Sequence, residues 1–203
     1  MHVLLVNGSP HAKGCTYTAL SEIAGILKEE GIESTIFHIG TDPVHPCIGC
    51  RKCKELGKCV FDNDIANDLL DAMLNADGVI IGSPVYFAGP AGALCTILDR
   101  VFSAGSSRFA LKPAAAIASC RRGGLETTMD RLNKYFTVSQ MPVVPSTYWN
   151  GIHGNTPEEV FQDKEGMQVM RMLGHNMAWM LKSFSANPDR PDGEKKVKTN
   201  FVR

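Results

Sequence analysis

The sequence predicts an α/β protein built on a doubly wound parallel sheet. Strand-like and helix-like stretches alternate along the chain, which is typical of a parallel sheet with helices on both faces. The run Gly78–Gly82 (GVIIG) is apolar throughout, as a central parallel strand should be. The first strand leads into the loop NGSPHAKG and then into a helix. We therefore expect one α/β domain at residues 1–183, followed by a polar arm at residues 184–203.

The expected elements follow from periodicity and from helix signals. Leu20, Ile23 and Leu27 lie on one face of the first helix, and Thr156 with Pro157 forms a helix start. We expect five strands, at residues 3–6, 34–39, 78–82, 112–119 and 141–144. We expect helices at residues 17–30, 63–74, 91–102, 125–136 and 157–182.

Composition excludes several classes of protein. The 21 basic and 21 acidic residues balance, so the net charge gives no reason to expect a nucleic-acid partner. No apolar run approaches the roughly 20 residues of a membrane span, and the N-terminus runs directly into a strand without a signal-peptide pattern. We therefore expect a cytoplasmic protein. Its seven cysteines then favour metal, cluster or redox work over a disulfide framework.

The loop after the first strand has the features of a phosphate site. It opens a helix, whose N-terminal N–H groups and dipole favour an anion. Five residues separate Gly8 from Gly14, where a P-loop has four, and Cys15 replaces the P-loop lysine; a dinucleotide Gly-x-Gly-x-x-Gly pattern is also absent. The hydroxyls of Ser9 and Thr16 without a lysine fit a single terminal phosphate, as on FMN. The alternative is an ordinary strand-to-helix turn.

Two further loops are expected at the same edge of the sheet, because the carboxyl ends of parallel strands meet there. Ser83–Pro90 (SPVYFAGP) contains two aromatic residues that form a partly apolar ledge suited to a flat ring. Ser119–Gly124 (SCRRGG) combines glycines, which permit close backbone approach, with arginines, whose charge would favour a reduced, anionic flavin. Alternatively, Tyr86 and Phe87 belong to the core and the arginines to a solvated turn.

The segments GSPHAKGCT, GSPVYFAGPAGALCTILDR and SCRRGG resemble the FMN-binding loops of the flavodoxin-like NAD(P)H-dependent FMN reductases, over roughly residues 2–182. The resemblance implies a flavodoxin-like sheet of order 2-1-3-4-5, with FMN as cofactor and NAD(P)H as co-substrate. It also implies a homodimer or homotetramer with FMN near the interface. The implied cofactor-binding residues are Ser9, His11, Gly14, Cys15, Thr16, Pro84, Val85, Tyr86, Phe87, Gly89, Ser119, Cys120, Arg121, Arg122, Gly123 and Gly124.

Two positions depart from this pattern. His11 stands where an arginine is common in the family, and Cys15 stands where a serine or asparagine is common. A thiol at a helix N-terminus can have a lowered pKa, so one hypothesis makes Cys15 reactive when FMN is absent. The other treats it as a small residue tolerated beside the phosphate.

A cysteine-rich insert at residues 47–59 follows the second strand. Cys47, Cys50, Cys53 and Cys59 have the spacing C-x2-C-x2-C-x5-C. Three thiolates within seven residues can surround one face of a [4Fe–4S] cluster, and the fourth can complete it, as in ferredoxins. Structural zinc more often uses two separated pairs, and thiols without metal or a disulfide are further alternatives. The motif is similar to that of the iron–sulfur flavoproteins, which join it to the same FMN fold.

These features predict an FMN-dependent oxidoreductase that accepts electrons from NAD(P)H or a reduced carrier. The acceptor would be small, such as a quinone, a metal or oxygen, and a cluster would add single-electron transfer. The flavin itself performs the chemistry, so no catalytic side chain is expected. The alternative function is a non-enzymatic electron carrier or redox sensor. The aromatic loop Tyr148–Gly154 and the polar arm suit contact with a second subunit. The alternatives for the loop are that it controls access to the flavin or that it only packs against the protein.

Overall fold

The computed structural model describes residues 1–195, 197, 199 and 201. Five parallel strands form the central sheet in the order β2-β1-β3-β5-β6, and a two-residue strand, β4, pairs antiparallel with the end of β3. The predicted flavodoxin-like topology is confirmed. The strands are β1 His2–Asn7, β2 Glu33–His38, β3 Gly78–Tyr86, β4 Gly89–Pro90, β5 Ala114–Cys120 and β6 Gly151–His153.

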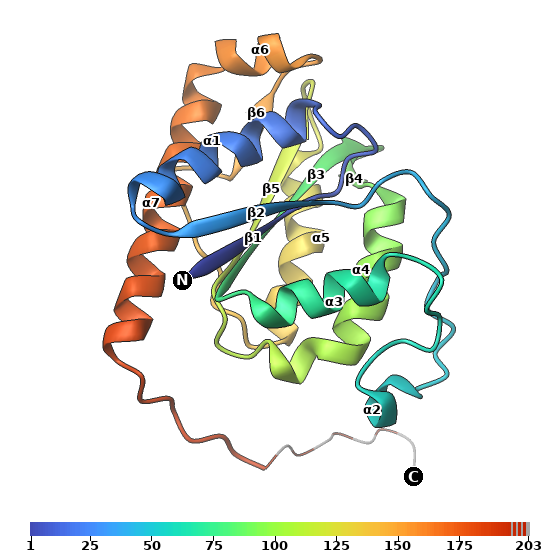
Figure 1. Ribbon diagram of the computed structural model, residues 1–203. Coiled ribbons are helices and arrows are strands. Elements are labelled where there is room, and N and C mark those ends of the chain that lie inside the picture. Colours follow the sequence, from blue (N-terminus) through green and yellow to red (C-terminus); the bar gives the residue numbers. More distant parts are fainter. Residues whose placement is uncertain (196, 198, 200, 202–203) are drawn as a thin grey trace.

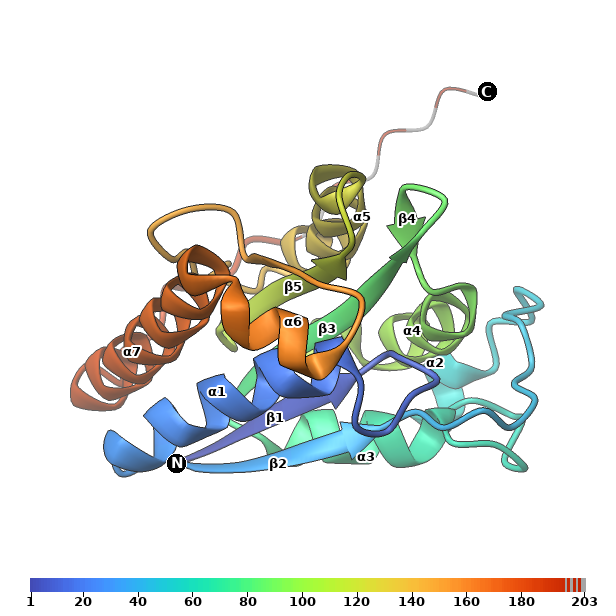
Figure 2. The same ribbon diagram turned by 90° about the horizontal axis from the view of Figure 1, so that it is seen from above.

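Helices cover both faces of the sheet (Figure 1, Figure 2). One face carries α1 Cys15–Glu29, α6 Pro157–Gln162 and α7 Lys164–Ala186, and the other carries α3 Ala66–Asn75, α4 Gly92–Gly105 and α5 Leu125–Val138. Two short helices are α2 Cys53–Leu56 and the 3-10 turn η1 Ser106–Arg108. No helix in the described part of the chain is both long and apolar enough to cross a membrane.

The core forms as two layers because side chains alternate across β1. Leu4 and Val6 pack with α3, α4 and α5, whereas Val3 and Leu5 pack with α1 and α7. Residues of β3 and β5 divide between the same two clusters. Burial on both faces explains why these strands read as continuous apolar runs in the sequence. The polar loops at their carboxyl ends are therefore held by a rigid support.

The position predicted for the fifth strand is wrong. Residues 141–144 make only an isolated bridge, between Ala114 and Val143, and the fifth parallel strand is β6. Asn150 directs the chain there: it is buried, its side-chain amide donates to the Ala116 carbonyl at 3.2 Å, and its own carbonyl accepts from the Ala118 amide at 3.0 Å. β6 has three residues, too few for a periodic pattern to appear.

The single helix predicted at residues 157–182 is also wrong, because the chain breaks at Asp163 into α6 and α7. The Asp163 carboxylate accepts from the Gly166 amide at 2.9 Å, which caps α7, and from the His153 amide at 2.7 Å, which ties the cap to β6. The predicted cap at Thr156 is confirmed, since its hydroxyl accepts from the Glu159 amide at 3.3 Å. α7 continues to Ala186, and residues 196, 198, 200, 202 and 203 of the expected arm lie outside the described residues.

We predict that Gly151→Ala destabilises the protein. A Cβ at Gly151 would lie 1.8 Å from Cδ1 of Leu125, so the Leu125 side chain must repack or the elements that carry the two residues must move, at a cost of about 1–3 kcal/mol. Gly25→Ala is the matched control, because its Cβ meets no atom within 4 Å and alanine favours the helix. Urea unfolding measures both variants. Equal stability of the two variants would contradict the packing described for β6.

Candidate functional site

The loops that follow β1, β3 and β5 meet at one edge of the sheet. The Gly8 amide donates to the Gly82 carbonyl at 2.8 Å, which joins the first loop to β3. The hydroxyls of Thr16 and Ser119 lie 2.8 Å apart, which joins the start of α1 to the end of β5. Both hydroxyl-bearing residues are buried. The structure therefore brings together the first and third of the loops that the sequence singles out.

The second and third loops also contact each other directly. The Thr127 hydroxyl donates to the Ala88 carbonyl at 2.6 Å. Gly124 adopts a left-handed conformation with φ of 87°, and a Cβ there would lie 2.7 Å from Cα of Ala88. Glycine is thus required for this close approach. All three predicted loops form one continuous rim.

A buried asparagine that the sequence pattern did not single out organises the first loop. The Asn7 side-chain amide donates to the carbonyl of His11 at 3.3 Å, and its oxygen accepts from the Ser9 amide at 3.2 Å. The Ser9 hydroxyl accepts from the His11 amide at 3.1 Å. His11 itself is exposed at the outside of the loop. The available signal was a polar residue at the end of an otherwise buried strand.

The N-terminus of α1 is open to an anion. Gly14 occupies the N-cap position, no side chain caps the helix, and its first turn contains no acidic residue. The first amides of the helix are therefore free of a side-chain cap, and the helix dipole adds positive potential. The chemistry of this donor set fits a phosphate group.

The hypothesis that Cys15 has a lowered thiol pKa is wrong, because the pKa is raised. Burial raises the pKa of the Cys15 thiol, and the negative charges of Glu159 and Glu158 add to that rise, outweighing the favourable backbone hydrogen bond. The sulfur contacts the Gly154 carbonyl at 3.7 Å. The structure thus supports a neutral thiol packed beside the first loop.

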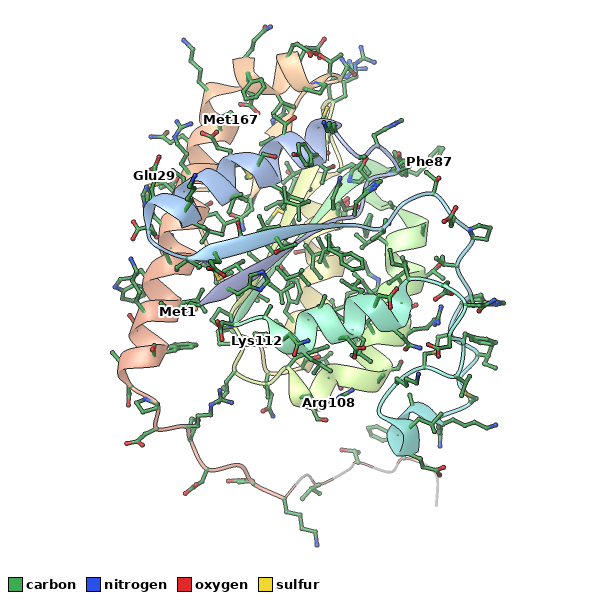
Figure 3. The ribbon with its side chains drawn as sticks, viewed as in Figure 1. Met1, Glu29, Phe87, Arg108, Lys112 and Met167 are labelled. Atoms are coloured by element: carbon green, nitrogen blue, oxygen red, sulfur yellow. The ribbon has the colours of Figure 1, made fainter. Side chains whose placement is uncertain are left out.

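The second loop is a tight hairpin between β3 and β4. Phe87 and Ala88 form its tip and both have positive φ, 50° and 57°, which non-glycine residues adopt at a cost of about 1–3 kcal/mol each. The Ser83 hydroxyl accepts from the Ala91 amide at 2.9 Å and closes the base of the hairpin. Phe87 is fully exposed at the edge of the molecule (Figure 3). An aromatic side chain held outward on a strained turn is suited to contact a ligand or a partner.

The predicted ring residues have different exposures. Tyr86 and Phe87 are exposed, so the alternative that they belong to the core is wrong. Pro84, Val85 and Gly89 are half-buried along the hairpin, whereas Arg121, Arg122 and Gly123 are exposed on the third loop. Cys120 is buried against Leu125 and Met129, and burial raises its thiol pKa.

A cavity of about 170 Å³ lies beside the third loop. Its lining includes Arg122 and Gly123 of the third loop and Tyr148, Trp149 and His153. Trp149 is 54% exposed and packs on Tyr148, with 5.0 Å between ring centroids. This aromatic loop therefore stands next to the rim formed by the three strand-end loops.

The four cysteines of the insert line a single cavity of about 190 Å³. All four are free thiols: Cys47 and Cys50 are exposed, and Cys53 and Cys59 are half-buried. Gly49, Arg51 and Gly57, with φ between 62° and 69°, fold the insert around this cavity. The disulfide alternative for these cysteines is thus absent from the described part of the chain.

The cysteine positions can be compared with the geometry of a metal site. A single zinc ion with Zn–S bonds of about 2.3 Å requires sulfurs about 3.8 Å apart. Among the described residues no three His, Cys, Asp or Glu side chains form a set that could hold a metal ion. The cysteines provide four thiolate donors in one cavity, which is the donor type that both zinc and iron–sulfur clusters use.

Arg100, on α4, connects the insert to the protein core. Its side chain is buried, its Nε donates to the Cys59 sulfur at 3.1 Å, and it forms an ion pair with Asp64. Burial raises the pKa of the Asp64 carboxyl, but hydrogen bonds from Arg100 and from the amides of His45 and Ala66 outweigh it, so the pKa is lowered. Nothing in the sequence pattern identifies Arg100, because its partners lie 36 or more positions away.

Comparisons with known proteins agree with this arrangement. The family model described as NADPH-dependent FMN reductase matches residues 1–156. An iron–sulfur flavoprotein of Methanocaldococcus jannaschii is 34% identical over 190 residues, covering 90% of this chain and 98% of that protein.

Solved structures establish the fold. The structure of RosB with the bound intermediate 8-demethyl-8-formylriboflavin-5'-phosphate superposes with a TM-score of 0.73 at 13% identity, over 100% of this chain and 92% of RosB. The WrbA-like flavodoxin of Agrobacterium tumefaciens gives 0.63 at 16% identity, over 90% of this chain and 96% of that one.

We predict that Thr16→Val destabilises the FMN-free protein by about 1–3 kcal/mol, because the substitution leaves the buried Ser119 hydroxyl without its partner. The double variant Thr16→Val with Ser119→Ala should recover most of this loss, since both partners are then apolar. Chemical unfolding without flavin measures four proteins: the wild type, Thr16→Val, Ser119→Ala and the double variant. Additive losses in the double variant would show that the two hydroxyls do not interact.

Proposed function

The chain belongs to the NADPH-dependent FMN reductase family, within its iron–sulfur flavoprotein branch, and from this we propose that it is an FMN-dependent oxidoreductase. Its electrons would come from NAD(P)H or a reduced carrier and pass to a small acceptor such as a quinone, a metal or oxygen. The observation that carries the proposal is the rim of three strand-end loops, where an uncapped helix N-terminus lies beside an outward aromatic hairpin.

The first loop would bind the FMN phosphate. The amides at the start of α1 offer donors, and the Ser9 hydroxyl is fixed by its bond to the His11 amide. Gly14, Cys15 and Thr16 complete this edge without adding a negative charge. A phosphate here would gain from both the amides and the helix dipole.

The second and third loops would hold the isoalloxazine ring. The hairpin from Pro84 to Gly89 supplies an aromatic and backbone edge, and the segment from Ser119 to Gly124 supplies backbone donors and two exposed arginines. The flavin supplies the hydride and electron chemistry when bound. The positive side chains of Arg121 and Arg122 would stabilise negative charge at that edge.

The aromatic loop would control access to this rim. Tyr148 and Trp149 are exposed and border the cavity that also reaches Arg122. Its lining combines these aromatic rings with the cationic Arg122 and with three acidic side chains, Glu126, Asp163 and Glu165. The aromatic rings suit a flat electron acceptor or a nicotinamide.

The insert would hold a [4Fe–4S] cluster through Cys47, Cys50, Cys53 and Cys59. The support is their shared cavity, their free thiols and the sequence spacing. A cluster supplies single-electron transfer when bound. α4 carries residues at both places: its first turn follows the ring hairpin, and Arg100 and Ser103 contact the cysteines.

We also propose a homodimer or homotetramer with FMN near the interface. Phe87, Trp149 and Ile48 are exposed apolar side chains on the rim, the aromatic loop and the insert. A neighbouring subunit would remove this apolar surface from water. The C-terminal arm after residue 183 is proposed to contribute to the same contact.

The competing function is an electron carrier or redox sensor with no NAD(P)H turnover. The exposed insert favours it, because a carrier must dock a partner near its redox centre. Anaerobic mixing with NADH or NADPH separates the two functions: bleaching of bound flavin at a catalytic rate supports the enzyme, and its absence supports the carrier.

We predict that Cys15→Asp weakens FMN binding at least about tenfold, or about 1.4 kcal/mol, because a carboxylate at the start of α1 repels the phosphate. Riboflavin, which lacks the phosphate, should lose much less affinity. Cys15→Ser is the matched control and should bind FMN almost as the wild type does. Fluorescence titration measures each affinity. Equal losses for FMN and riboflavin would place the phosphate elsewhere.

We predict that Cys50→Ala abolishes cluster binding and leaves FMN bound, because an incomplete thiolate set is labile while the flavin loops lie elsewhere. Anaerobically reconstituted wild type should show broad iron–sulfur absorption, with matching iron and sulfide contents. Cys95→Ala, which removes a cysteine outside the insert, is the control. In Cys50→Ala, reduction by a one-electron donor should slow, and direct reduction of FMN by NAD(P)H should persist. If the wild type binds no iron, the proposed cluster is wrong and an FMN reductase without a cluster remains.

A further inference from the structure

The buried Arg100 guanidinium has four partners that all belong to the cysteine insert or its immediate flanks. Its Nε donates to the Cys59 sulfur at 3.1 Å, and its two amino groups donate to the Phe61 carbonyl at 2.8 Å, to the His45 carbonyl at 3.2 Å and to the Asp64 carboxylate. The arginine therefore fastens both ends of the insert to α4.

The Asp64 carboxylate neutralises this guanidinium inside the protein. The two side chains are 1% and 3% exposed. Asp64 is itself fixed, because it accepts from the His45 amide at 2.9 Å and from the Ala66 amide at 3.1 Å. With its charge matched, Arg100 can act on Cys59 mainly through the directed N–H···S hydrogen bond.

The backbone of Cys59 is fixed independently. The Asn67 side chain accepts from the Cys59 amide at 2.9 Å and donates to the Cys59 carbonyl at 3.1 Å. Phe61 stacks on His45 with 4.4 Å between ring centroids, and the Arg100 guanidinium lies 5.6 Å from the Phe61 ring. Cys59 is thus presented to the cavity in one orientation, with Arg100 behind its sulfur.

The other thiols differ in their surroundings. Cys53 contacts the Ser103 carbonyl at 3.5 Å, which is an acceptor, and Cys47 and Cys50 are exposed. Among the hydrogen bonds of the described residues, Arg100 makes the one donated to a sulfur of the insert. The four proposed ligands are therefore chemically unequal.

We propose that Arg100 is a positioning residue that orients Cys59 and, by donating a hydrogen bond to its sulfur, raises the reduction potential of the cluster. This inference rests on the proposed cluster. A donor on a ligating sulfur withdraws electron density and favours the reduced, more negative state. Exposed lysines around the insert are not required for this effect.

The decisive experiment is a redox titration of the anaerobically reconstituted protein. Electron paramagnetic resonance of the reduced cluster monitors the titration. Arg100→Lys keeps a positive charge but loses the fork that reaches Cys59, Phe61 and Asp64 together. Its cluster should have a more negative midpoint potential than the wild type. Its cluster should also be lost about tenfold faster to an iron chelator, as expected when an outer partner of a ligand is removed. The FMN potential in the same sample is the internal reference and should not change.

Arg108→Lys is the matched control. Arg108 follows α4 (Figure 3) and donates to the Gly57 carbonyl of the insert, but among the described hydrogen bonds it contacts no sulfur. Its cluster should keep the wild-type potential and release rate. A shift common to both variants would reveal a general effect of docking the insert and would overturn the specific role of Arg100.

A second variant covers the case in which Arg100→Lys does not fold. Arg100→Met combined with Asp64→Asn removes both charges, so no buried charge is left unpaired. After Asp64→Asn, the side-chain amide oxygen at position 64 can still accept from the Ala66 amide. Its cluster should show the same negative shift. An unchanged potential in either folded variant overturns the role of Arg100 while leaving the cluster in place, whereas wild type that binds no iron overturns the proposed cluster itself.

Discussion

The close contact between Gly8 and Gly82 is the constraint on which the rest of the site depends. A Cβ at Gly8 would lie 2.5 Å from Cδ2 of Leu94 and 2.7 Å from the Gly82 carbonyl. A Cβ at Gly82 would lie 2.8 Å from Cγ2 of Thr16. Glycine is therefore required at both positions, because a side-chain carbon has no room where β1, β3, α1 and α4 meet. The first loop can therefore lie directly over β3, and the proposed phosphate and ring positions are brought to one rim.

Much of the fold could be predicted because the core follows a simple rule. Strands buried on both faces read as apolar runs, as Val3–Val6 and Val79–Ile81 do, and the helices between them show a 3.6-residue period. β6 follows no such rule: it is three residues long, and the polar Asn150 places it through tertiary hydrogen bonds. The helix break at Asp163 likewise depends on its second contact, with His153, a partner outside the helix.

The features of the site also fall into those that the sequence indicates and those that it does not. The proposed phosphate loop, the aromatic hairpin and the cysteine spacing are local, so the sequence alone contains them. Asn7 and Asn67 bond to groups within eight positions of themselves, in irregular turns that no periodic pattern marks. Arg100 acts on segments that only the folded chain brings near it. The raised pKa of the Cys15 thiol has the same origin, because its burial and the approach of Glu159 on α6 both arise only after folding. Long-range polar contacts are what sequence periodicity cannot reveal.

The placement of the insert against α4 determines which parts of the chain can change length. The segment between Cys53 and Cys59 lies at the surface with no buried side chain, so one extra residue there would mainly lengthen a loop. One extra residue within α4 would turn Arg100 by about 100° around the helix and shift it about 1.5 Å along it. The guanidinium would then leave Cys59 and Asp64, both held on other segments. Natural length variation should therefore accumulate between the last two cysteines and be absent from the helix beneath them.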